Sequence, residues 1–403
     1  MSGLVPPTKW IACRSKPFGA IAATTLLYRQ AIATFLLSKS KYFKPRHLHK
    51  TGRMVCVAPK PMQRFESTRT IRLVFLAALA TRFLLSPEIG WGQITPGLMV
   101  DHWNEGAADC SQNPQPPLEV HPYNSRTFIL RESLCATFEA PFMYLLVGST
   151  RALLIDTGDV ADPSRMPLAK TVMSLLPKAG SATFPLLVVH THRHGDHRSG
   201  DTQFEASANV QVVRFDLNSV LEYYRFAHWP DGLAPIDLGD RIVDAMPTPG
   251  HNETEISFYD RETGLFFSGD FLMPGRLLID NAGADLASAD RVAAFVKDHP
   301  ISYVLGGHIE MNSAGRLFSW QSQYHPQERA LQMSKDDLAA LPAALRDFNG
   351  FYTVRGNFTM ENPIRVLIFE GVLVFAFVIG CGWILVRYRR RRGLARGTAK
   401  VNA

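Results

Sequence analysis

The chain has 403 residues, 46% hydrophobic and 20% charged, which is enough for one large folded domain with appended segments. The net charge of +7 comes from the two ends: residues 1–90 hold 15 Lys and Arg against 2 acidic residues, and residues 387–403 hold 7 against none. The stretch 91–386 is acidic, with 21 basic and 34 acidic residues. This acidic middle argues against nucleic acid as a partner, because phosphate binding requires a positive face.

The first 90 residues are interpreted as a basic N-terminal extension. Within it, the segment 71–85 is an apolar run that follows several arginines and contains the small-residue triplet Ala78-Leu79-Ala80. These features predict a secretory signal, although Arg82 interrupts the apolar run. An organelle transit segment or a stretch without fixed structure is the alternative interpretation, and no fold is assigned to residues 1–61.

Between about 118 and 346, short apolar runs alternate with helical patterns, which predicts a layered α/β domain. The predicted strands are 144–147, 152–155, 186–189, 210–213, 242–243, 256–259, 265–267 and 303–305, and the predicted helices are 167–176, 290–298 and 327–345. Cys110 and Cys135 are the two cysteines of the acidic middle. They would form a disulfide in an exported protein, and two unpaired thiols are the equally weighted alternative.

Residues 366–386 form an apolar run of 21 residues that is followed by Arg389-Arg390-Arg391-Arg392. A helix of this length crosses a hydrocarbon core of about 30 Å. The pattern predicts a transmembrane helix with a basic cytoplasmic tail at 387–403, and it places the preceding domain on the extracytoplasmic side. A buried core helix is the alternative.

The strand 186–189 runs directly into H-T-H-R-H-G-D-H at 190–197. Neutral imidazole and carboxylate groups are the ligands that suit a divalent cation such as zinc. In an extended segment the side chains of His192 and His194 project to the same side, so both can reach one metal. Gly195 then allows the chain to turn and to direct the last two residues of the run toward a second metal.

The H-x-H-x-D-H run resembles the signature of the metallo-β-lactamase superfamily. Four further sequence elements of that family occur in order. They are Asp156-Thr157-Gly158 after a strand, Pro249-Gly250-His251, Ser268-Gly269-Asp270, and Gly306-Gly307-His308. The resemblance covers residues 154–308 and implies a four-layer αββα metallo-β-lactamase sandwich, with a catalytic domain at 118–346 and the transmembrane helix after it.

The resemblance also implies a set of metal ligands. These are His192, His194 and His251 on the first metal, Asp196, His197 and His308 on the second, and Asp270 bridging both. Asp196 and Asp270 are the candidate catalytic residues, because each can accept a proton from the nucleophilic water. Asp156 either orients ligands or caps the turn before Gly158. The implied cofactors are two divalent ions, zinc in the first place, with iron and manganese as alternatives.

We therefore expect a hydrolase in which a metal-bridging hydroxide cleaves an ester, thioester, lactone or amide bond of a small molecule. In the family, β-lactamases generally carry cysteine or serine where this chain has Asp270, whereas thioesterases of the glyoxalase II type and lactonases carry aspartate. β-Lactamase activity, a di-iron redox enzyme and a membrane-tethered binding module without catalysis are the alternatives. The oligomeric state is left unassigned.

Several other residues are weaker candidates for facing the substrate. They are Phe142-Met143-Tyr144, the aromatic group Tyr223, Tyr224, His228 and Trp229, and Arg276. Core packing is the alternative for the aromatic group, and a surface salt bridge is the alternative for Arg276.

Overall fold

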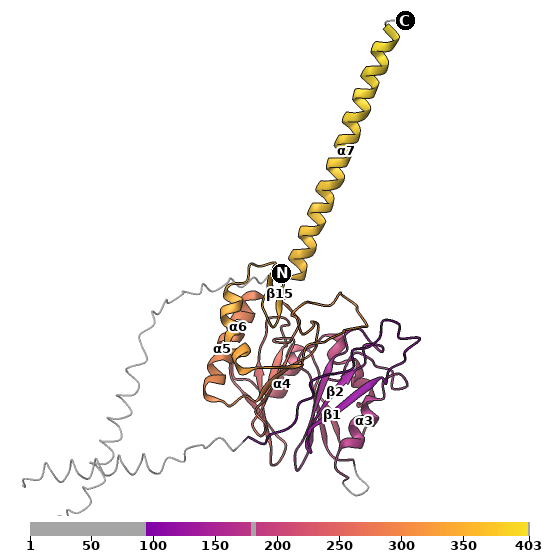
Figure 1. The fold of residues 1–403 in the computed structure, drawn as a ribbon. Helices are drawn as coiled ribbons and strands as arrows, with labels where there is room; N and C mark the ends of the chain where they lie inside the picture. Colours follow the sequence, from indigo (N-terminus) through magenta and orange to yellow (C-terminus); the bar gives the residue numbers. More distant parts are fainter. Residues whose placement is uncertain (1–93, 179–182, 402–403) are drawn as a thin grey trace, which may run out of the picture. The chain divides into compact units, whose positions relative to one another are not determined.

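The computed structural model of the chain describes residues 94–178 and 183–401 (Figure 1). The N-terminal extension 1–90 and its predicted signal-like segment 71–85 lie outside the described residues. Two six-stranded sheets form the centre of the described region.

The first sheet keeps its strands in sequence order. They are β1 (Leu118–Asn124), β2 (Thr127–Glu132), β3 (Phe142–Val147), β4 (Ala152–Ile155), β5 (Leu186–Val189) and β6 (Val210–Val212). The first four strands are antiparallel, and β4, β5 and β6 run parallel to one another. Every residue of β3, β4 and β5 is buried, which explains why these strands read as continuous apolar runs.

The second sheet has the order β13-β12-β10-β9-β8-β7. Its strands are β7 (Ala234–Asp237), β8 (Ile242–Pro247), β9 (Ile256–Asp260), β10 (Leu265–Gly269), β12 (Tyr303–Gly306) and β13 (Gln332–Met333). Its β10 and β12 pair in parallel. β10 ends one residue before Asp270 and β12 ends two residues before His308, so their carboxyl ends deliver both predicted ligands to the same edge.

The buried apolar side chains form three clusters, one between the two sheets and one on the outer face of each sheet. Along β3, Tyr144 and Leu146 pack with Phe258 and Phe267 of the second sheet, whereas Leu145 points to the opposite face. That opposite face is covered by α3 (Leu168–Leu175). The outer face of the second sheet is covered by α5 (Ala282–Asp298) and α6 (Lys335–Arg346). The order helix, sheet, sheet, helix is the predicted four-layer αββα sandwich, which is thereby confirmed.

Shorter elements complete the fold. The 3₁₀ turns η1 (Gly195–His197) and η2 (Ser199–Gln203) follow β5, and α4 (Leu217–Tyr224) follows β6. A third sheet has the order β11-β15-β14, made of β11 (Arg276–Leu278), β15 (Thr359–Glu361) and β14 (Tyr352–Val354). The folded region thus continues past residue 346, where the predicted catalytic domain was drawn to end: Met360 of β15 is fully buried in the core beneath α5 and α6.

Two helices differ from their predicted bounds. The predicted helix 290–298 is the second half of α5, which begins at Ala282 after Asn281 caps it by accepting a hydrogen bond from the Ala284 backbone N–H. Its first turns contain small and polar residues and therefore lack apolar periodicity. The predicted helix 327–345 begins only at Lys335, because Ser334 and Asp337 form a capping box there.

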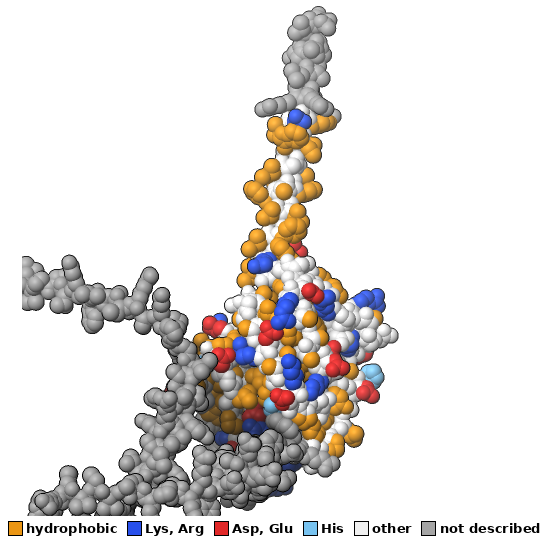
Figure 2. All heavy atoms as spheres, turned by 90° about the vertical axis from the view of Figure 1, so that its left-hand side faces the viewer, with side chains coloured by type: hydrophobic (Ala, Val, Ile, Leu, Met, Phe, Trp, Pro, Cys, Tyr) orange, Lys and Arg blue, Asp and Glu red, His pale blue; other side chains and the backbone are white. Residues whose placement is uncertain are grey.

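The chain ends in α7 (Pro363–Val401), which contains the predicted span 366–386. Among the described residues this is the one helix long and apolar enough to cross a membrane, with a mean hydropathy of 2.3 over Pro363–Tyr388. Figure 2 shows hydrophobic side chains along this helix, and none of its most apolar window is buried against the rest of the protein.

Candidate metal centre

The H-x-H-x-D-H run lies in the loop after β5 and in the tight turn η1. Asp156, at the end of the adjacent β4, has a positive φ of 65° and turns its carboxylate under this loop. It accepts hydrogen bonds from the backbone N–H and the hydroxyl of Thr191 at 2.7 and 2.8 Å, and its Oδ2 lies 2.9 Å from Nδ1 of His197. These contacts hold the loop and one histidine ring in place.

Three histidines form a first cluster. His194 Nδ1 lies 2.9 Å from His192 Nε2 and 3.1 Å from His251 Nε2. His251 comes from the loop after β8, and its other ring nitrogen donates to the carbonyl of Leu278 in β11 at 3.0 Å. That bond fixes the tautomer of His251 and leaves Nε2 with a free lone pair toward the cluster.

Asp196, His197 and His308 form a second cluster. Asp196 Oδ2 lies 3.4 Å from His197 Nε2 and 3.3 Å from His308 Nε2, and the two ring nitrogens are 3.2 Å apart. His308 donates from Nδ1 to the carbonyl of Glu139 at 2.7 Å. Each cluster therefore contains one ring that a backbone carbonyl orients.

Asp270 lies between the two clusters and offers one oxygen to each. Its Oδ2 is 3.6 Å from His251 Nε2 and 3.9 Å from His192 Nε2. Its Oδ1 is 3.5 Å from His197 Nε2 and 3.6 Å from His308 Nε2. This buried Oδ1 has no hydrogen-bond partner, which is costly for a carboxylate unless a cation is nearby.

The arrangement fits metal ions by the chemistry and spacing of its donors. Two nitrogens bound to one tetrahedral zinc at 2.0–2.1 Å are about 3.3 Å apart, and the ring nitrogens of the clusters are 2.9–3.2 Å apart. Three groups of three His or Asp side chains have their ligand atoms within 4.8 Å of one another, and one of these groups joins Asp270 to both clusters. All seven predicted ligands are thus brought together.

The electrostatics of the centre favour a bound cation. Burial lowers the pKa of His192 well below its usual range, so this ring is a neutral donor. Burial acts in the same direction on His308, but the carboxylates of Asp270 and Asp196 outweigh it and raise the pKa of His308 to about 10. Burial opposes ionisation of Asp270, yet the surrounding histidines hold its pKa well below the usual range. The ionised carboxylates thus concentrate negative charge among the imidazole rings, which favours a cation at this centre.

Sequence reasoning missed several residues beside the centre. Asn252 places Nδ2 3.1 Å from Nε2 of His194. Glu255 is fully buried, and both its carboxylate oxygens lack a hydrogen-bond partner. Asp285 lies so close to Gly250 that a side chain there would collide with it, and Gly307 similarly leaves room for Asp270. In the sequence, only Gly250 before His251 and Gly307 before His308 indicated that other side chains lie this close to the backbone.

The weaker candidates take mostly structural positions. Residues 142–144 belong to β3 and are buried, and the Tyr144 hydroxyl donates to the Gly306 carbonyl. Tyr224 is also buried in the core, whereas Trp229 lines a cleft beside His251. Arg276 pairs with Glu310 and covers the ring of Trp320, but its side chain is buried, so this is an ion pair of the interior rather than the predicted surface salt bridge.

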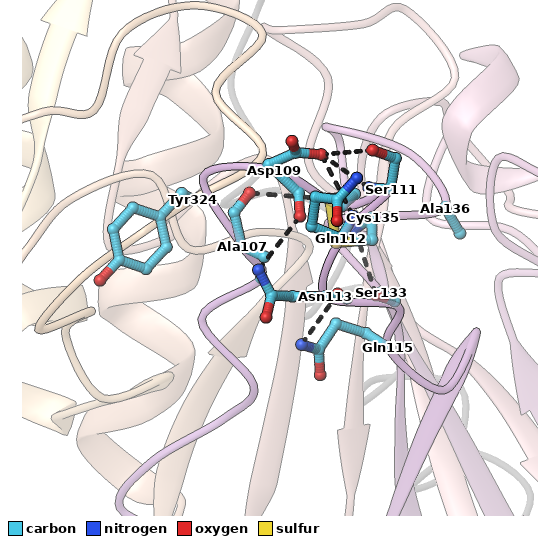
Figure 3. The surroundings of a disulfide bond; sticks show 12 residues. Ala107, Asp109, Ser111, Gln112, Asn113, Gln115, Ser133, Cys135, Ala136 and Tyr324 are labelled. Atoms are coloured by element: carbon cyan, nitrogen blue, oxygen red, sulfur yellow. Dashed lines mark hydrogen bonds between the residues drawn. A yellow bond between two sulfur atoms is a disulfide. The ribbon is translucent and has the colours of Figure 1, made fainter.

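Cys110 and Cys135 form a disulfide, with Cα atoms 5.4 Å apart (Figure 3). The structure thus decides between the two alternatives left by the sequence. Asp109 tightens the turn after Ala107 by accepting from the backbone and hydroxyl of Ser111. The second cysteine begins the loop that carries Glu139, whose carbonyl orients His308. The disulfide therefore anchors one wall of the centre.

The family model described as "Metallo-beta-lactamase superfamily" matches residues 136–345, just over half of the chain. The chain belongs to this superfamily and is an enzyme of its metallo-hydrolase class. The matched range contains all seven of the clustered histidines and aspartates.

The chain is also similar to individual proteins of known sequence and structure. The chain is 28% identical over 235 residues to "Acyl-coenzyme A thioesterase MBLAC2" of Gallus gallus, which covers 50% of this chain and 84% of the relative. The protein of the same name from Homo sapiens is 27% identical over 216 residues, covering 45% and 77%. Among solved structures, "Metallo-beta-lactamase from Pontibacter korlensis" has 16% identity and a TM-score of 0.41, covering 57% of this chain and all of that one.

Proposed function

We propose that the chain is a binuclear metallo-hydrolase that cleaves acyl thioesters. The observation that carries the proposal is the position of Asp270, which directs one carboxylate oxygen to each of two three-residue clusters. In this assignment His192, His194 and His251 would hold one ion, Asp196, His197 and His308 would hold the other, and Asp270 would offer one oxygen to each. Zinc is the proposed metal, because the donors are imidazole nitrogens and carboxylates at tetrahedral spacing.

Divalent ions in such a site lower the pKa of bound water toward about 7 and polarise a carbonyl oxygen. The protein residues supply the rest of the chemistry. Asp196 and Asp270 are ionised at neutral pH, because neighbouring histidines keep their pKa values below the usual range in spite of burial. Either carboxylate can therefore accept a proton when water adds to the acyl carbon. The C–S bond then breaks, and the proton passes to the departing thiolate, which gives a carboxylic acid and a thiol.

Two observations favour a thioester over a β-lactam. The relatives with the matches reported above are named as acyl-coenzyme A thioesterases. The bridging position is occupied by aspartate, as in the glyoxalase II type, and its two oxygens reach both clusters. A thioester substrate is also the class whose leaving group, a thiolate, needs the least assistance from a general acid.

Metal analysis combined with a substrate panel tests the proposal. The purified full chain, metal-free and then reloaded with zinc, would be assayed against a thioester, an oxygen ester, a lactone and a cephalosporin. We expect zinc-dependent thioesterase activity that Asp270→Asn reduces by about a hundredfold or more. His102→Ala, which changes an exposed histidine outside the clusters, serves as the matched control. Preferential cephalosporin hydrolysis, or tightly bound iron without hydrolysis, would overturn the proposal.

We also propose that α7 anchors the enzyme in a membrane with the catalytic domain on the extracytoplasmic side. The exposed apolar helix supports the anchor, and the basic tail 387–403 supports a cytoplasmic end. The Cys110–Cys135 disulfide supports an oxidising compartment for the domain. Protease added to intact cells or sealed vesicles should digest the domain and spare the tail. Protection of the domain together with cleavage of the tail would reverse the orientation.

A further inference from the structure

A cleft of about 440 Å³ lies beside the metal ligand His251, within the size range of small-molecule sites. Its apolar lining includes Leu217, Trp229, Pro249 and Ala284. Its charged lining consists of Glu253 and Asp280 against Arg193, and Arg193 is already paired with Glu253. Because carboxylates outnumber guanidinium groups, the cleft suits an uncharged chain rather than a polyphosphate.

The residue next to the rim of this cleft is hydrogen-bonded to the two residues that precede α7. The backbone N–H of Ile279 donates to the carbonyl of Glu361, and Asn362 Nδ2 donates to the carbonyl of Ile279, both at 2.7 Å. Asp280, on the cleft rim, is the next residue after Ile279, and α7 begins at Pro363. With strands about 4.8 Å apart and residues 3.8 Å apart, the Cα atoms of Asp280 and Asn362 are within about 10 Å of each other.

The cleft also lies close to the apolar part of α7. The apolar run begins at Val366, four residues after Asn362, which is about 6 Å along a helix. With α7 anchored as proposed above, the rim of the cleft would lie within about 16 Å of the edge of the hydrocarbon core, whatever the direction of α7. A long acyl chain can span that distance while its distal part remains in the bilayer.

Exposed apolar side chains lie on and beside β14, the strand that pairs with β15. The side chains of Phe351, Tyr352 and Val354 in and beside β14 are 45%, 44% and 59% exposed, although β14 lies in the same sheet as β11. We call these three side chains the β14 platform. The ring of Phe351 also lies 6.2 Å from that of Phe369 in α7. Exposed aromatic residues next to a membrane helix are typical of the interface between headgroups and hydrocarbon.

We infer that the substrate is a long-chain acyl thioester partitioned into the bilayer, taken into the cleft beside His251 from the membrane surface on which the β14 platform rests. The inference rests on the proposed function and adds the physical state of the substrate to it. The acyl chain occupies the apolar part of the cleft, and the thioester carbon reaches the metal clusters next to His251. Hydrolysis breaks the acyl C–S bond, forms a C–O bond to water and leaves the proton on the thiol.

The experiment uses the full chain reconstituted in phosphatidylcholine vesicles. One probe is a sixteen-carbon acyl thioester of a phospholipid carried in the same vesicles, and the other is a water-soluble four-carbon acyl thioester. We expect the rate on the first probe to follow its mole fraction in the bilayer rather than its bulk concentration. The variant Phe351→Ser/Tyr352→Ser should lower that rate about fivefold or more, because the domain loses its contact with the interface. Its rate on the soluble probe should stay within about twofold of the wild type, which also shows that it folds.

Leu98→Ser/Tyr324→Ser removes two exposed apolar side chains elsewhere and is the matched control. Equal losses in both double variants, or a rate that follows bulk concentration, would overturn the inference and leave the proposed function standing. Hydrolysis of the soluble probe alone would have the same meaning. If neither probe is hydrolysed by the zinc-loaded enzyme, the proposed function fails and this inference with it.

Discussion

Oδ2 of Asp156 lies 2.9 Å from Nδ1 of His197, and both side chains are almost completely buried. The carboxylate fixes the tautomer of the ring and increases the basicity of Nε2, the atom that faces the second cluster. Thr191 donates hydrogen bonds to the same carboxylate, so one aspartate positions both the loop and the ring of a proposed ligand. The alternative that Asp156 only caps the turn before Gly158 does not account for these contacts.

We therefore predict that Asp156→Asn weakens zinc binding by about 10- to 100-fold without unfolding the protein. Competition with a chromophoric chelator measures the affinity, and circular dichroism checks the fold. Asp201→Asn is the control, because Asp201 binds His190, a histidine outside the clusters, at 2.8 Å. Equal losses of affinity in the two variants would show that the effect is not specific to the ligand His197.

A second prediction concerns the stoichiometry of the centre. Because His251 belongs to one cluster and His308 to the other, each alanine variant should lose one ion and keep the other, so that about two ions per chain become about one. Elemental analysis after dialysis against metal-free buffer measures this. An unchanged content of two ions in either variant would remove that histidine from the ligand set. Loss of both ions in each variant would indicate a single, interdependent site.

Much of this arrangement could be predicted from the sequence, because its short motifs follow buried strands. The end of β5 leads into the H-x-H-x-D-H run, and the parallel pair β10 and β12 ends at Asp270 and His308. Apolar runs in the sequence predict such strands, and the polar motifs that follow them predict where the metal centre lies. The grouping of the ligands came from the family resemblance, since no local pattern tells which distant histidine joins which cluster.

Other features depend on contacts between distant segments and left no local signal. Leu278 orients His251 through its backbone carbonyl, and any residue type offers that group. The pairing of β11 with β15 joins segments about 80 residues apart, and strands of three residues are too short for periodicity to reveal. The first turns of α5 were missed because their small and polar residues form no apolar stripe, and the cap at Asn281 was not recognised.

Glu132 gives a prediction about pH. Burial raises the pKa of Glu132 to about 8, although it accepts hydrogen bonds from the backbone N–H groups of Asp159 and Val160. Between its unfolded pKa near 4.5 and about 8, the folded protein keeps a proton that the unfolded chain has released. The free energy of unfolding should therefore decrease as the pH rises through this window, by at most about 1.4 kcal/mol per pH unit, and level off above it.

Glu132→Gln should flatten that dependence, because the neutral amide has no proton to lose. Urea unfolding in detergent micelles at several values between pH 5 and pH 9 measures the slope for each protein. Glu205→Gln, at an exposed glutamate, should leave the wild-type slope in place. If the slope of the Glu132→Gln variant matches that of the wild type, the pH dependence arises from other groups.

The Cys110–Cys135 disulfide gives the last prediction. It closes a loop with a sequence separation of 25, and the loss of such a cross-link costs about 3.5 kcal/mol by the chain-entropy relation. Cys110→Ala/Cys135→Ala should lower the free energy of unfolding by about this amount, measured by urea unfolding under oxidising conditions. It should also weaken zinc binding, because Cys135 anchors the loop whose Glu139 carbonyl orients His308. Cys381→Ala, at the exposed unpaired cysteine of α7, should change neither quantity. A double variant with lower stability but unchanged zinc affinity would mean that packing alone holds the loop in place.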